Sequence, residues 1–134
     1  MTKLLNVGVL GAAKIAKTHV IPAMKNVTGL TFWGVASRSL AKGEEYIQQL
    51  GPEAIEGEVH ALEGYEAILN SAEVDIIYNP LPNDLHVELS LKALAAGKHV
   101  LCEKPLALTA IDAKRLADAS AKKPELKVME AFMY

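Results

Sequence analysis

Short apolar runs, separated by longer stretches with helical periodicity, constrain the fold of this chain more than any other feature. Each run is short enough for one buried strand, and the runs cover residues 4–10, 30–36, 74–78, 99–102 and 126–131. Such alternation is typical of a parallel sheet with helical crossovers. A weaker strand is predicted near Ala54-Ile55, followed by a short helix from Leu62 to Leu69. The pattern predicts an α/β fold with a doubly wound, mostly parallel six-stranded sheet.

Helix boundary residues agree with this alternation. Asn83 is predicted to cap a helix over residues 84–96, which Gly97 would close. Thr109 and Asp112 have the spacing of a capping box for the helix that follows, through residue 121. Local capping signals and the strand pattern therefore favour the same fold.

Size and charge narrow the classes of function. The 134 residues match one domain, residues 1–134, and carry a formal net charge of -2. Charges of both signs are scattered, so we expect no nucleic-acid partner, and no apolar stretch approaches the roughly 18 residues of a membrane helix. Cys102 is the only cysteine, which excludes an intrachain disulfide and favours a reducing, cytoplasmic location.

The first strand leads into a glycine-containing turn, Gly11-x-Ala13-x-x-Ala16. Glycine lets the backbone bend sharply at such a turn, and the following helix offers unpaired N–H groups to a dinucleotide pyrophosphate. The alternative is a tight turn of the kind found in any doubly wound protein. Pro22 lacks a backbone donor and should end or kink the first helix near residues 20–21. The predicted pyrophosphate-binding residues are Gly11, Ala12, Ala13, Lys14 and Ile15.

The end of the second strand bears on the choice of cofactor. NAD enzymes commonly place a carboxylate there to bind the ribose hydroxyls, whereas this chain has Ser37 and Arg38. A hydroxyl and a guanidinium suit the 2′-phosphate of NADP, and Lys42 adds charge one helical turn later. NADP is therefore the predicted cofactor, with NAD as the alternative. An ordinary solvated arginine at a strand end is the simpler interpretation of Arg38.

The second half of the chain carries the most specific motif. Asn79-Pro80-Leu81-Pro82-Asn83-Asp84-Leu85-His86 follows the fourth predicted strand, and Gly97-Lys98-His99-Val100 leads through the fifth into Glu103-Lys104-Pro105. With these motifs the whole chain, through Val128–Tyr134, resembles the glucose–fructose oxidoreductase and inositol dehydrogenase family (Gfo/Idh/MocA). The resemblance implies an NAD(P)-binding Rossmann domain, which family members follow with a second, α+β substrate domain.

The resemblance also implies roles for individual residues. Lys104 matches the family's catalytic lysine, whose ammonium can polarise a carbonyl or stabilise an alkoxide during hydride transfer. Its bond to Pro105 is a candidate cis peptide. Glu103 and the backbone of Asn79, Pro80 and Leu81 map to positions that line the nicotinamide ribose, with Asn83 and His86 close by.

Other reactive residue types have simpler interpretations. Lysine before proline at a strand end is usually a solvated loop residue, and His86 could lie on a helix surface. His19, His60 and His99 are predicted to be structural, because no carboxylate or thiol completes a metal-ligand pattern with them. Cys102 follows apolar residues and is predicted to be a buried, inert thiol.

Three functions compete for this sequence. The leading one is the cofactor-binding domain of an NADP-dependent oxidoreductase acting on a sugar, polyol or related carbonyl, with the substrate domain absent and little turnover expected. The second is a non-catalytic nucleotide-sensing or regulatory protein, which the retained Lys104 disfavours. The third is a fragment that pairs with a separate chain. Met129, Phe132, Met133 and Tyr134 are expected to leave an apolar patch at the sheet edge, which predicts a homo-oligomer.

Overall fold

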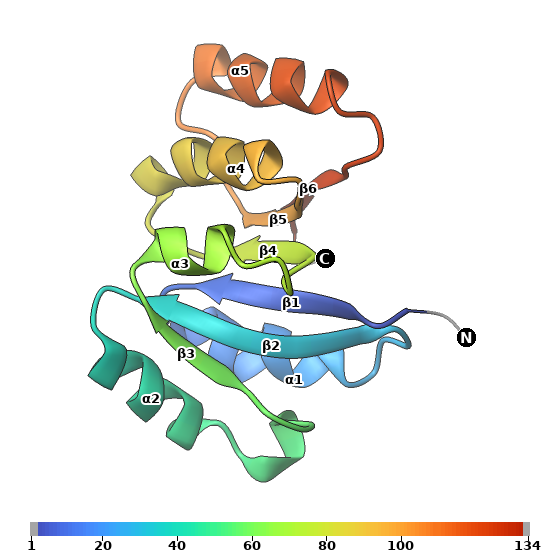
Figure 1. The fold of residues 1–134 in the computed structure, drawn as a ribbon. Helices are drawn as coiled ribbons and strands as arrows, with labels where there is room; N and C mark the ends of the chain where they lie inside the picture. Colours follow the sequence, from blue (N-terminus) through green and yellow to red (C-terminus); the bar gives the residue numbers. More distant parts are fainter. Residues whose placement is uncertain (1–2, 133–134) are drawn as a thin grey trace.

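Six strands form one sheet in the computed structural model, which describes residues 3–132 (Figure 1). The strands are β1 (Leu5–Leu10), β2 (Leu30–Ser37), β3 (His60–Glu63), β4 (Ile76–Asn79), β5 (His99–Glu103) and β6 (Val128–Ala131). Their order is β3-β2-β1-β4-β5-β6, and every neighbouring pair is parallel. This is the doubly wound Rossmann order, in which the direction of winding reverses between β1 and β4.

Helices connect the strands. The α-helices are α1 (Ile21–Met24), α2 (Leu40–Gln49), α3 (Tyr65–Leu69), α4 (His86–Ala95) and α5 (Ala110–Ala121). A π-helical segment, Ala16–Val20, precedes α1, and short 3₁₀ turns cover Pro52–Ala54 and Asn83–Leu85. Within residues 3–132 no helix is long and apolar enough to cross a membrane.

Two apolar clusters cover the two faces of the sheet. Successive strand residues point to opposite faces, so Leu10 and Ile77 pack under α3, α4 and α5, whereas Val9 and Tyr78 join the cluster under α1 and α2. On this second face α1 and α2 pack mainly against β1, β2 and β3, and their cluster extends to Tyr78 on β4 (Figure 1). Toward β5 and β6 the helices of the described residues give this face little cover, and Met129 on β6 is 60% exposed.

All five apolar runs form the predicted strands, but the prediction for the sixth strand is wrong. Residues 52–54 form a 3₁₀ turn closed by a 2.8 Å hydrogen bond from Ala54 N to Gly51 O. The strand is β3, which begins at His60 and includes Leu62, so the predicted 62–69 helix is correct only for α3. Strand β3 is short, lies at the edge of the sheet and contains no apolar run. It is recognised as a strand by its pairing with β2.

The helix boundaries differ from the predictions in detail. Asn83 lies inside a 3₁₀ turn, and no side chain caps that turn or α4. Gly97 closes α4 as predicted, with a φ of +80°. Thr109 caps α5 through a 3.1 Å bond from Asp112 N, but the Asp112 carboxylate binds Arg115 instead of completing the box.

Pro22 does not end the first helix. The Ile21 N–H donates to the Ala16 carbonyl five residues back, and helical structure continues as α1 through Met24. The hydrogen-bond pattern thus changes from π to α at residues 20–21, where Pro22 cannot donate.

Candidate active site

The turn after β1 is built around Gly11, whose φ is +79°. This backbone conformation favours glycine, and a Cβ added there would lie 2.6 Å from Leu81 Cδ2, so the Leu81 side chain would have to move. The Gly11 N–H donates to the Ala36 carbonyl at 2.7 Å, which ties the turn to the end of β2. The Gly11 backbone therefore lies close both to the end of β2 and to Leu81, which follows the end of β4.

Ala13 continues this turn into the helix. Its carbonyl accepts a 2.7 Å hydrogen bond from the Tyr46 hydroxyl on α2. Burial raises the pKa of Tyr46, so the hydroxyl remains a donor. The neighbouring helix α2 thus contributes a hydrogen bond that holds the turn in place.

The turn opens into a hollow of about 510 Å³ at the carboxyl ends of β1, β2 and β4. Ser37 is buried at its wall, whereas Arg38 and Lys42 are exposed at its rim. Its lining residues are Gly11, Ala12, Ala13, Ser37, Arg38, Lys42, Tyr65, Pro80, Leu81 and Pro82. A glycine turn, a hydroxyl and two cations around one cavity suit a phosphorylated nucleotide.

The predicted residues do not all line this hollow. Lys14 lines an adjoining hollow of about 550 Å³ with Ala12 and Lys42, and Ile15 is half-buried outside both. Asn83 is exposed on its 3₁₀ turn. Tyr65, at the start of α3, also lines the hollow and was not among the predicted residues, because its place depends on β3, whose position was not predicted.

Asn79 and His86 are fully buried. Asn79 Oδ1 accepts from Leu81 N at 3.3 Å, and its Nδ2 donates to the His86 carbonyl at 3.2 Å and to Ser90 Oγ at 3.3 Å. The His86 ring nitrogen Nε2 lies 2.6 Å from the Leu81 oxygen. Both side chains therefore hold the loop that carries Pro80 and Leu81, and neither lines the hollow.

Lys104 follows β5 with an exposed side chain, and the Lys104–Pro105 peptide is cis. The neighbouring Glu103 carboxylate accepts a 2.6 Å hydrogen bond from the Tyr78 hydroxyl on β4. Burial, and next this bond, raise the pKa of Tyr78. Because the strands are parallel, Lys104 and Gly11 lie at the same carboxyl edge of the sheet (Figure 1).

The remaining histidines and the cysteine have structural surroundings. His60 stacks on Trp33 with ring centroids 4.3 Å apart, and His99 Nδ1 accepts from Lys127 N at 3.0 Å. His19 shares a 2.7 Å contact with Thr18 Oγ1. Cys102 is fully buried, and burial raises its pKa to about 11. Across residues 3–132, no three His, Cys, Asp or Glu side chains gather as a metal site would require.

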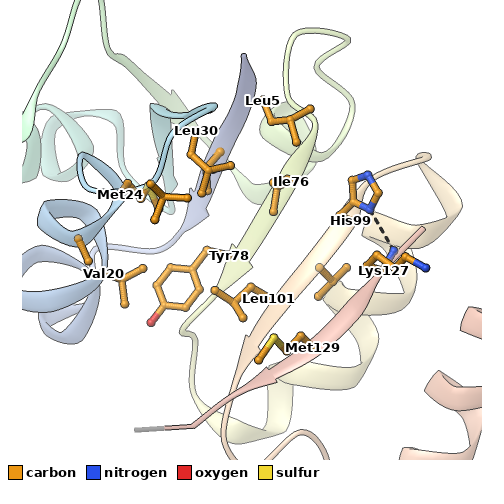
Figure 2. A pocket seen from close by; sticks show the side chains of 14 residues that line it. Leu5, Val20, Met24, Leu30, Ile76, Tyr78, His99, Leu101, Lys127 and Met129 are labelled. Carbon is orange, nitrogen blue, oxygen red and sulfur yellow. Dashed lines mark hydrogen bonds between the residues drawn. The ribbon is translucent and has the colours of Figure 1, made fainter. Parts of the chain in front are cut away.

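A hollow of about 480 Å³ lies elsewhere, on the second face of the sheet between the α1 region and strands β4, β5 and β6 (Figure 2). Figure 2 shows Met24 and Leu30 on one side of it and Leu101 and Met129 on the other. Its lining is almost entirely apolar and includes neither the glycine turn nor Lys104. The polar atoms of His99 and Lys127 contribute little to its surface, so this apolar groove is poorly suited to orient a nucleotide or a sugar.

Comparison with known proteins shows that the relatives of this chain are oxidoreductases. A sequence profile described as the GFO_IDH_MocA oxidoreductase family, NAD-binding Rossmann fold, matches residues 5–132. The chain is 39% identical over its full length to 38% of a dTDP-3,4-didehydro-2,6-dideoxy-alpha-D-glucose 3-reductase from Saccharopolyspora spinosa. It is 36% identical over 95% of its length to 37% of an NADP(+)-dependent D-xylose 1-dehydrogenase from Haloferax volcanii.

A solved structure agrees in fold. The 3-ketoreductase of Actinomadura kijaniata, crystallised with TDP-benzene and NADP in an open conformation, superposes with a TM-score of 0.86 at 35% identity. The match covers 97% of this chain and 39% of that enzyme. The chain thus spans less than two fifths of the length of these relatives.

Proposed function

Because this chain belongs to the Gfo/Idh/MocA oxidoreductase family, we propose that it is the cofactor-binding part of an NADP-dependent oxidoreductase. The substrate of the whole enzyme would be a sugar, polyol or related carbonyl compound, the class that the names of its relatives indicate. The observation that carries this proposal is the hollow at the carboxyl edge, where Gly11 and Arg38 line one cavity.

The residues of the hollow fit a dinucleotide. The Gly11 turn would receive the pyrophosphate, because a residue without a side chain permits the tight turn and the close approach of the backbone to the phosphates. Ser37, Arg38 and Lys42 would hold the 2′-phosphate of NADP, because hydroxyl and cationic groups bind phosphate oxygens. The loop of Pro80 and Leu81 continues the cavity toward β5. Lys14 would add positive charge from the adjoining hollow.

Lys104 has the proposed catalytic role. The bound nicotinamide would give or take the hydride, and the Lys104 ammonium would stabilise negative charge on the reacting oxygen. Glu103, held by Tyr78, would line the nicotinamide ribose. Asn79 and His86 would act through the loops that they hold, and Asn83 from its exposed turn. Proton transfer also requires a partner group and a positioned substrate, so we expect residues 1–134 alone to bind NADP(H) with little turnover.

The alternative function, a nucleotide sensor without catalysis, would use the same cavity. An exposed Lys104 at the same sheet edge favours the enzyme, because a sensor has no use for an ammonium beside the nicotinamide. Pairing with a separate substrate-domain chain would also be compatible with this fold.

The test is a titration of NADPH and NADH against the purified chain and its Arg38→Ala variant. We expect the wild-type chain to prefer NADPH and R38A to lose that preference by about tenfold or more, since a charged hydrogen bond contributes roughly 1.5–3 kcal/mol. NADH affinity should be unchanged. Arg115→Ala is the matched control, because Arg115 pairs with Glu88 and Asp112 on the surface of α4 and α5. Equal, weak binding of both cofactors by the wild-type chain would overturn the proposal.

We further propose a homo-oligomer in the cytoplasm. The apolar groove supports association, because parallel sheets normally have both faces covered. The single, buried Cys102 is compatible with a reducing compartment. Met133 and Tyr134, which were predicted to join the apolar patch, lie outside the described residues.

A further inference from the structure

The peptide that joins Pro105 to Leu106 is held at both of its polar atoms. Its carbonyl oxygen lies 2.7 Å from His86 Nδ1, at the start of α4. Its N–H donates to Glu130 Oε2 of β6, also at 2.7 Å. Two side chains that are far apart in sequence therefore hold the one peptide unit that follows Lys104–Pro105.

The second ring nitrogen of His86 is also occupied by a carbonyl. Its Nε2 lies 2.6 Å from the Leu81 oxygen. A carbonyl oxygen has no proton to give, so each of these contacts is a hydrogen bond only if the ring nitrogen carries the proton. A neutral imidazole has a single N–H, and its bare nitrogen would face the other oxygen lone pair to lone pair. Two such contacts require the doubly protonated ring.

We infer that His86 is an imidazolium in the folded chain and that His86 and Glu130 together form a charged clamp on the Pro105–Leu106 peptide, which positions Lys104. The two charges match the peptide dipole, with the cation at its oxygen and the anion at its N–H. His86 is fully buried, so its charge must be compensated by strong hydrogen bonds, and the two short carbonyl contacts supply them.

The clamp also reaches the cofactor hollow. The carbonyl of Leu81 accepts from His86, while the Leu81 side chain packs against the Gly11 turn. His86 thus joins the loop that carries Lys104 to the loop that lines the hollow. The importance of this link for catalysis rests on the proposed role of Lys104, whereas the clamp itself does not depend on any bound nucleotide.

Nitrogen-15 NMR of the labelled wild-type chain, without nucleotide and near neutral pH, tests the protonation directly. We expect both ring nitrogens of His86 to resonate in the range of protonated imidazole nitrogens. His99 is the internal reference, since its Nδ1 accepts from Lys127 N and should appear as a bare nitrogen. A bare nitrogen on His86 in the same spectrum would overturn the inference, and this spectrum requires no variant to fold.

Variants test whether the clamp holds the loop. His86→Gln keeps a neutral amide NH₂ as the donor group and removes the positive charge. Glu130→Gln keeps a carbonyl oxygen as the acceptor and removes the negative charge. His99→Gln is the matched control. We expect hydrogen exchange of the Leu106 amide to accelerate by about tenfold or more in H86Q and several-fold in E130Q, because charge-assisted hydrogen bonds are stronger than neutral ones. The Lys104 backbone amide resonance should shift in both variants and stay in place in H99Q.

Unchanged exchange at Leu106 in H86Q and E130Q would show that the loop is held without the clamp. These measurements are made on the nucleotide-free chain, whereas the proposed function is tested by the NADPH titration. A chain with the clamp and no NADPH binding would contradict only the proposed function, and the reverse result would contradict only the clamp.

Discussion

Two separate causes disfavour a side chain at Gly11. Its φ of +79° disfavours any L residue, and an added Cβ would lie 2.6 Å from Leu81 Cδ2. Gly57 shares only the first cause, with a φ of +77° and open space around it. The pair therefore separates backbone strain from steric exclusion at the cofactor hollow.

We expect Gly57→Ala to lower the free energy of unfolding by about 1–2 kcal/mol through strain alone. Gly11→Ala should cost about 2–5 kcal/mol, because Leu81 must also move within a packed region. G11A should lose NADPH affinity as well, since its methyl group narrows the turn, whereas G57A should bind normally. Urea unfolding and NADPH fluorescence titration measure both effects, and equal destabilisation of the two variants would contradict the packing argument.

Cys102 gives the folded chain a pH dependence on the alkaline side. Burial raises its pKa from 9.0 to about 11, so the unfolded thiol ionises at a pH where the folded thiol is still protonated. The folded state then binds more protons than the unfolded state, and stability must fall as pH rises. Its contribution is complete below about pH 9 and is lost between about pH 9 and 11.

Between pH 8 and 10 this loss should amount to about 1.4 kcal/mol, the equivalent of one pKa unit. Cys102→Ala should show a correspondingly flatter profile of unfolding free energy against pH. Tyr46 and Tyr78 also have raised pKa values, but they are present in both proteins and cancel in the difference. Urea unfolding at the two pH values makes the comparison, and parallel profiles would exclude Cys102 as the cause.

Individual residues also show which parts of the site the sequence could predict. The Gly11 turn and Lys104 were predicted correctly at one sheet edge, because parallel strands align their carboxyl ends. His86 was expected beside the cofactor, yet its ring is enclosed between the Leu81 and Pro105 carbonyls. Those two contacts depend on how two loops meet in space, which the spacing of residues along the chain does not encode.

At the scale of elements, the sequence pattern predicts the buried strands and misses the strand that is half exposed. The strands that lie inside the sheet, such as β1 and β4, have apolar runs because both of their faces are covered. Strand β3 is at the edge, and its residues are half-buried or exposed. It is stabilised by pairing with β2 and by the stacking of His60 on Trp33, so its existence is a tertiary property.

The cap of α5 is a local feature, so its contribution can be isolated. Thr109 Oγ1 accepts from Asp112 N at 3.1 Å, away from the cofactor hollow. Thr109→Ala should lower the free energy of unfolding by about 1 kcal/mol, whereas Thr109→Ser keeps the hydroxyl and should cost less. NADPH affinity should be the same in both variants. Equal stability of T109A and T109S in urea would show that the cap is not energetically significant.

At the scale of the whole molecule, the helices cover one face of the sheet fully and the other face only in part. Helices α3, α4 and α5 cover one side, and α1 and α2 leave the apolar groove over β4, β5 and β6 (Figures 1 and 2). Strand β6 is also an edge strand, and Met129 on it is 60% exposed. An apolar groove beside an open edge favours association with a second copy of the chain.

We therefore expect the apparent mass of the wild-type chain to rise with concentration in analytical ultracentrifugation. Met129→Glu should shift the equilibrium toward the monomer, because association would bury the new carboxylate without a partner. Ile111→Glu is the matched control, since Ile111 is 77% exposed on α5, away from the groove, and its replacement should leave the mass unchanged. A wild-type mass that stays monomeric at every concentration would contradict association through this face. A loss of association in I111E but not in M129E would place the contact on α5 instead.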